Sequence, residues 1–139
     1  MYKTITSQIM IILQGISAVK AIYPHPIQGT TDKSPCVIFF QVDGGRVYST
    51  NTENENTYKY KMWVGVDTAG TTLQKVWSDI LPSTVDKIIA EFDEKYKSVI
   101  DGKRSWLIID SENWGISTEN NGLKCYAVLS LTFKVCSDI

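Results

Sequence analysis

The chain has 139 residues, a length that supports one hydrophobic core and favours a single domain spanning residues 1–139. Hydrophobic residues make up 43% of the sequence and charged residues 21%, which excludes disorder as the main state. Lys and Arg number 14 and Asp and Glu 15, so no global field draws the chain to phosphate backbones or anionic lipid.

The first predicted element is a helix with a broad apolar stripe. Its stripe consists of Ile5, Ile9, Ile12, Ile16 and Val19, at spacings of four and three. Further apolar residues widen the stripe, so the helix needs cover on more than one side, from the domain's own sheet or from a neighbouring subunit. We expect Thr4 or Thr6 to cap its start and the prolines of residues 23–26 to end it and form a stiff connector.

A β-hairpin and a polar loop are predicted next. Residues 35–42 are β-branched and aromatic, and Asp43-Gly44-Gly45 is typical of a tight turn before a returning strand over residues 46–50. The stretch 49–57 is polar and carries no apolar anchor. We therefore expect it to be an exposed, mobile loop.

The middle of the chain predicts a strand and then a helix. Residues 58–67 alternate between two faces, which indicates a half-buried strand with Trp63 pointing away from the apolar face. The helical spacing that follows is interrupted at Pro82, and Ser83 is the expected cap of a second helical segment. One continuous kinked helix is the alternative.

The last third of the chain predicts two more strands. They cover residues 105–110 and 123–136, separated by a polar connection over 111–122. The long last strand belongs at the centre of the sheet, with Tyr126 and Val128 on its less apolar face. The predicted fold class is α+β: an antiparallel sheet of about four to five strands with helices on one face, in the order α-β-β-β-α-β-β.

The sequence predicts no catalytic residue, metal ligand or cofactor site. His25 is the only histidine and lies between two prolines, so we expect a surface or packing role. The glycines at 44–45 and 70 lack the spacing of a phosphate-binding loop. Three carboxylates are expected to be solvated surface groups, although acid/base chemistry is conceivable for them: Asp110, Glu112 and Glu119.

The cysteines fit a protein of a reducing compartment, and the longest apolar run near the N-terminus is too short to span a membrane. Cys36, Cys125 and Cys136 are odd in number, so free, mostly buried thiols are expected, with a disulfide between two of them as the less favoured alternative. The apolar run over residues 9–13 is far shorter than the ~20 residues of a membrane-spanning helix. We expect no signal peptide.

Outward-facing apolar side chains favour oligomerisation. Trp63, Tyr126 and Val128 all point to the second face of the sheet, and the first helix is apolar over much of its circumference. Such a face, uncovered by helices, is typical of a surface that binds a partner. For each residue taken alone, chance exposure is an equally good explanation.

The chain resembles the tail terminator, or tail completion, proteins of long-tailed bacteriophages. The resemblance lies in the element order and in three local features: an N-terminal helix leading to Ile22-Tyr23-Pro24, the strand entry Ser34-Pro35-Cys36-Val37-Ile38, and the strand Tyr58-Lys59-Tyr60-Lys61-Met62-Trp63-Val64-Gly65-Val66 followed by a helix. These are patterns of residue type, and they extend over most of the chain.

The resemblance implies a structural virion protein, made in the host cytoplasm, and no enzyme. Such a protein forms a hexameric ring that caps the tail tube at its head-proximal end, stops its growth and joins the head connector, while DNA passes without specific binding. Seven residues are candidates for protein interfaces: Ile9, Ile12, Asn51, Glu53, Glu55, Trp63 and Tyr126. The polar loop would dock on the tube or the connector, and its two glutamates, if they lined the lumen, would repel DNA phosphates.

Two other classes of function stay open from the sequence. One is a small-molecule-binding or enzymatic α+β domain that uses a cleft between sheet and helices, with Asp110 and Glu112 at its rim. The other is a monomeric adaptor that binds a different protein.

Overall fold

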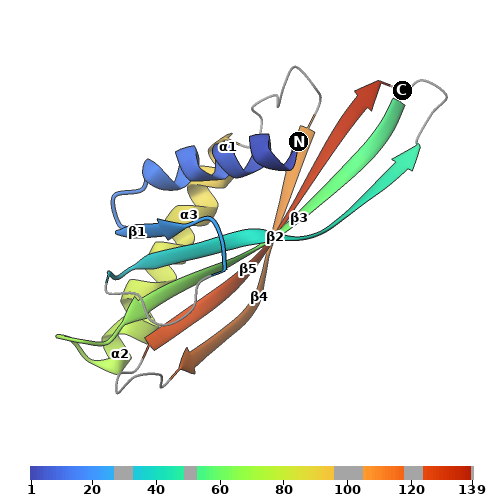
Figure 1. The fold of residues 1–139 in the computed structure, drawn as a ribbon. Coiled ribbons are helices and arrows are strands. Elements are labelled where there is room, and N and C mark those ends of the chain that lie inside the picture. Colours follow the sequence, from blue (N-terminus) through green and yellow to red (C-terminus); the bar gives the residue numbers. More distant parts are fainter. Residues whose placement is uncertain (27–32, 49–52, 96–104, 118–123, 139) are drawn as a thin grey trace.

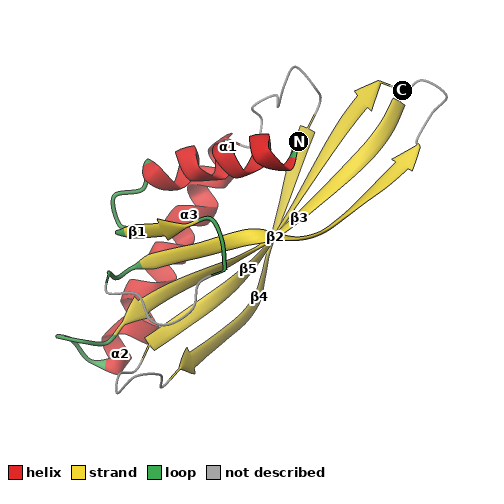
Figure 2. Ribbon diagram, viewed as in Figure 1, coloured by secondary structure: helices red, strands yellow, loops and turns green. Residues whose placement is uncertain are grey.

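A computed structural model of the protein describes residues 1–26, 33–48, 53–95, 105–117 and 124–138. One five-stranded sheet carries the helices on one of its faces (Figure 1, Figure 2). The elements are, in chain order, α1 (Tyr2–Gln14), β1 (Ala21–Tyr23), β2 (Cys36–Tyr48), β3 (Glu53–Asp67), α2 (Leu73–Lys75), η1 (Val76–Ile80), α3 (Leu81–Lys95), β4 (Ser105–Ser117) and β5 (Lys124–Asp138). The predicted α+β class is confirmed.

The strands lie side by side in the order β1-β2-β3-β5-β4. The four long strands pair antiparallel with their neighbours, and short β1 adds to β2 in parallel, so the sheet is mixed. β3 and β5 pair along their whole length, from Glu53 opposite Asp138 to Asp67 opposite Lys124. The predicted central position of the last strand is therefore confirmed.

The core lies between the sheet and the helices, because apolar side chains alternate along the strands and recur every three to four residues along the helices. On β3, Tyr60, Met62 and Val64 are completely buried. The helices bring Ile5, Ile9, Leu13, Val85, Ile88 and Phe92 onto that face. The apolar stripe of α1 is thus covered largely by the domain's own sheet and α3.

α2, η1 and α3 follow one another without a break, so the continuous helix is the correct alternative and Ser83 is not a cap. The helix begins at Thr72, whose hydroxyl oxygen accepts a hydrogen bond from the Lys75 amide at 3.2 Å. Pro82 has no amide hydrogen to donate to the preceding turn, and the helix passes through a π-helical turn directly before it. The buried Thr84 hydroxyl donates to the carbonyl of Ile80 at 2.8 Å and so satisfies an acceptor of that turn.

The hairpin turn predicted at Asp43-Gly44-Gly45 is wrong, because β2 continues through these residues to Tyr48. A register shift between Gln41 and Asp43 accommodates Val42 as a bulge, and pairing with β3 resumes beyond it. The three-residue strand β1 was not predicted, and it ends at Tyr23, where the predicted connector of residues 23–26 begins. A side-chain cap at Thr4 or Thr6 is also wrong, since α1 begins at Tyr2 with no side-chain cap.

The distal parts of β2, β3 and β5 extend beyond the helices as a projecting arm (Figure 1). We define the arm as residues 44–48, 53–58 and 133–138, which begin at the row Gly44, Tyr58 and Phe133. At the base of the arm, β4 pairs with β5 as far as Val135, and Phe133 and Val135 are buried in the core. The loop predicted over 49–57 is therefore wrong for residues 53–57, which are part of β3 and pair with β2 and β5. Residues 49–52 lie outside the described part of the chain.

Candidate interaction surfaces

The outer face of the sheet, opposite the helices, carries a row of apolar side chains that crosses four strands. Tyr23, Ile38, Trp63 and Val128 are successive partners on β1, β2, β3 and β5. The Phe40 ring stacks on Trp63, with centroids 5.3 Å apart and planes 19° apart. We call these five residues the outer row. Trp63 thus points away from the core, as predicted.

Tyr126 lies on the same outer face, next to the outer row. Its strand partners are Gly65 on β3 and Gly115 on β4. The Tyr126 ring covers Gly115 so closely that a Cβ added there would lie 2.6 Å from the ring carbon Cζ. Glycine at this position lets the ring lie flat across β4, which extends the aromatic surface toward the sheet edge.

A second apolar surface lies at the other side of the domain, where the helix layer ends above β4. Leu73 and Trp77 are one helical turn apart, and Trp114 and Ile116 are two residues apart on β4. The two tryptophan rings meet edge to face with centroids 6.4 Å apart. Their exposed fractions are 38% for Leu73, 37% for each tryptophan and 45% for Ile116. We call these four residues the edge patch.

The predicted interface residues are only partly brought together. Trp63 and Tyr126 share the outer face, whereas Ile9 is completely buried in the core and Ile12 packs against it, so Ile9 offers no surface to a partner. Glu55 lies in the arm, where Lys134 Nζ is 3.8 Å from its carboxylate. Glu53 is in β3 with its side chain outside what the structure describes, and Asn51 lies outside the described residues.

Of the groups considered for chemistry, the structure describes Asp110 and His25, which belong to opposite edges of the sheet. Asp110 pairs with Ser130, which places it on the outer face and away from any cleft under the helices. The side chain of Glu112 and all of Glu119 fall outside the described part of the chain. His25 is exposed, with Nδ1 2.9 Å from the Pro26 carbonyl oxygen. Within the described residues, no three His, Cys, Asp or Glu side chains gather to hold a metal ion.

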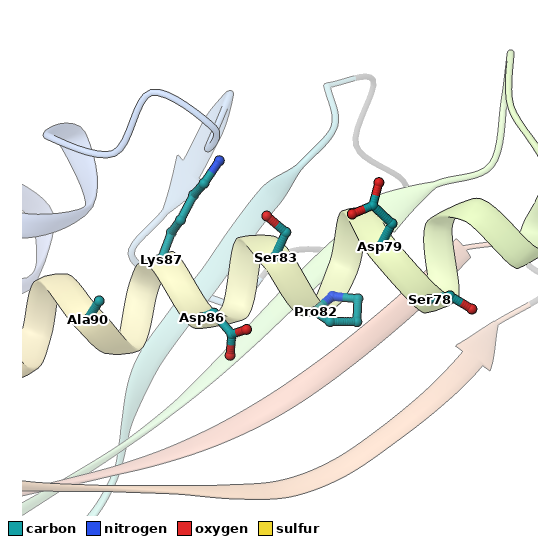
Figure 3. Close-up of a pocket in the computed structure, with 7 residues that line it drawn as sticks. All are labelled: Ser78, Asp79, Pro82, Ser83, Asp86, Lys87 and Ala90. Carbon is teal, nitrogen blue, oxygen red and sulfur yellow. The ribbon is translucent and has the colours of Figure 1, made fainter.

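A shallow, open depression of about 430 Å³ runs along the outside of η1 and α3 (Figure 3). All seven lining residues come from this one helical stretch: Ser78, Asp79, Pro82, Ser83, Asp86, Lys87 and Ala90. Because no second element among the described residues closes over it, the depression would leave a small molecule largely exposed to water.

Two buried groups have shifted acidities. Burial raises the pKa of Tyr60, its hydrogen bond with Thr6 acts in the opposite direction, and the nearby Tyr2 and Tyr58 raise it further. Burial also raises the pKa of the Cys125 thiol, which keeps it protonated and unreactive near neutral pH. None of the three cysteines is in a disulfide bond.

Stability should fall at alkaline pH because of Tyr60. An unfolded tyrosine ionises near pH 10, whereas the folded protein holds the Tyr60 proton to higher pH. The contribution is fully present below about pH 10, and it is lost as pH rises from there through the folded pKa, because the unfolded state then binds fewer protons. Urea unfolding at pH 9 to 11 should show a steeper decline for the wild type than for Tyr60→Phe. Equal slopes would contradict this assignment.

The chain matches no protein-family model and no curated protein sequence. Its class is therefore given by its own structure: an α+β domain with a mixed sheet, one bare sheet face and an exposed aromatic edge. In the described part of the chain, no helix is both long enough and apolar enough to cross a bilayer.

Proposed function

We propose that the protein is a structural protein of virion assembly, a ring-forming tail terminator that caps the tail tube and joins it to the head connector. One observation carries the proposal: the domain has two apolar surfaces on different sides, the outer row, whose side chains are half-buried apart from the buried Val128, and the edge patch, whose four side chains are each more than a third exposed. Exposed aromatic clusters of this kind are typical of protein interfaces and rare on surfaces that face only water.

A ring needs a heterologous contact, in which one surface of a subunit meets a different surface of the next. The outer row lies on the sheet face opposite the helices, and the edge patch combines α2 and η1 with the margin of β4 on the helix side. Contact between the outer row of one copy and the edge patch of the next would repeat with a fixed rotation. A repeat that closes after six copies gives the hexamer that the resemblance implies.

The projecting arm supports the proposal from another direction. It extends beyond the helices and offers a surface to the tail tube or to the connector (Figure 1). Glu55 forms a partly exposed ion pair with Lys134, so its charge is compensated within the arm. Repulsion of passing DNA by this glutamate is therefore not part of the proposal.

The mass of the assembled particle tests the proposal. We expect native mass spectrometry and light scattering to detect a six-subunit ring, either for the protein alone or after addition of the tail-tube protein encoded by the same genome. Electron microscopy should then show the ring at one end of each tube. The ring would be refuted if the protein stayed monomeric in both conditions at about 100 μM, a concentration at which even weak contacts associate.

A further inference from the structure

The arm leaves the helix-covered part of the sheet at a bulge. The register of β2 against β3 shifts between Gln41 and Asp43, and the extra residue Val42 is 46% exposed. β3 and β5 pass the same level without a shift in their mutual register. A bulge in one strand increases the local twist, which fits the change of direction where the strands pass beyond the helices (Figure 1).

Tyr2, in the first turn of α1, contacts the base of the arm. Its hydroxyl donates a hydrogen bond to the carbonyl oxygen of Asp43 at 3.1 Å, one residue beyond the bulge. Its ring meets Tyr58 edge to face, with centroids 4.8 Å apart and an angle of 86°. The same hydroxyl fills the space that a side chain at Gly44 would occupy, and Gly44 is the strand partner of Tyr58.

The backbone of Tyr2 is held from the other side by the core. Tyr60 is completely buried, and its hydroxyl donates to the Tyr2 carbonyl oxygen at 3.0 Å. The same hydroxyl lies 3.1 Å from the hydroxyl of Thr6, so it is bonded to two successive turns of α1. Because the Tyr60 hydroxyl is buried, losing either hydrogen bond would leave its donor or its acceptor site unsatisfied. The two bonds therefore hold the start of α1 in place.

We propose that Tyr2 is a clamp that fixes the arm to the helix-covered body of the domain. The backbone of Tyr2 is bonded to Tyr60 in the body, and its side chain is bonded to Asp43, directly before the arm, and packed on Tyr58 at the start of the arm. Release of Tyr2 loosens the arm from Gly44 and Tyr58 outward and leaves the body segments of β3 and β5 intact. Binding of a partner protein to the arm is thereby coupled to the first turn of α1. This coupling does not depend on ring formation.

Hydrogen exchange measured by mass spectrometry tests the clamp. In Tyr2→Ala, amides of residues 53–58 and 133–138 should exchange roughly tenfold faster, because one hydrogen bond and one aromatic contact are lost. Amides of the body segments 62–66 and 125–129 should be unchanged. Tyr2→Phe keeps the ring and loses the hydroxyl, so its arm should exchange at an intermediate rate.

Ile22→Ala is the matched control, because Ile22, like Tyr2, is half-buried and packs against the core but lies on β1, away from the arm. It should leave exchange in the arm unchanged. Unchanged arm exchange in Tyr2→Ala would overturn the clamp. An equal increase in arm and body would also overturn it, since Tyr2 would then act as an ordinary stabilising residue of the whole domain.

Discussion

Trp63→Ala is expected to weaken self-association about 30-fold or more while the domain stays folded. Tryptophan at the centre of an interface commonly contributes about 2 kcal/mol or more to binding. Trp63 lies in the middle of the outer row and stacks on Phe40 outside the core. Sedimentation equilibrium of the variant and the wild type, each checked by thermal unfolding, gives the change in association constant.

Ile11→Ala is the control for this prediction. Ile11 is 61% exposed on α1, more than either tryptophan of the edge patch, but it belongs to neither proposed surface. It should leave association unchanged. If Trp63→Ala instead unfolds the domain, Trp63 contributes to folding and the outer row loses its role as an interface.

Mixing variants distinguishes a heterologous contact from a symmetric one. Trp63→Ala keeps an intact edge patch, and Trp77→Ala keeps an intact outer row. At a protein concentration too low for the weakened contact to form, each variant alone should remain monomeric, whereas an equal mixture should form a dimer through the one intact pair of surfaces and stop there. A mixture that stays monomeric would contradict the pairing of outer row with edge patch.

The alternation of apolar residues predicted the body of the sheet correctly. The face assignments of Met62, Val64 and Trp63 on β3 and of Tyr126 and Val128 on β5 agree with the observed register. These strands are long, and their two faces differ strongly, because one is buried under helices. Period-two patterns carry the most information under that condition.

The arm was missed because its order comes from backbone pairing. Residues 53–57 are polar throughout, so no alternation marks them as a strand, yet each pairs with β2 or β5. Asp43-Gly44-Gly45 has the composition of a turn, but a bulge and the Tyr2 contact keep it within β2. Long-range contacts of this kind leave no local signal.

The edge patch was also missed, although a signal existed. The polar connection predicted over residues 111–122 is wrong for residues 111–117, which belong to β4 and include Trp114 and Ile116. The spacing of four between Leu73 and Trp77 and of two between Trp114 and Ile116 places each pair on one face. That the two pairs meet depends on the packing of η1 against the end of β4, which the sequence does not encode locally.

Phe92→Ala is expected to destabilise the domain by about 3–5 kcal/mol, the usual cost of removing a buried aromatic ring from a core. Phe92 is completely buried on α3, whereas Trp77 lies on η1, less than five turns earlier in the same continuous helix. Because over a third of Trp77 faces water, Trp77→Ala should cost about 1 kcal/mol or less.

Denaturant unfolding of both variants at low protein concentration compares the two faces of this helix without any contribution from association. If Trp77→Ala costs as much as Phe92→Ala, the Trp77–Trp114 contact is part of what holds the helix to the sheet, and the edge patch is no longer available to a neighbour. If the costs differ as expected while Trp77→Ala abolishes assembly, then the exposed tryptophan pair serves association. That combination follows only from a helix whose two faces have separate partners, the domain's own core and another subunit.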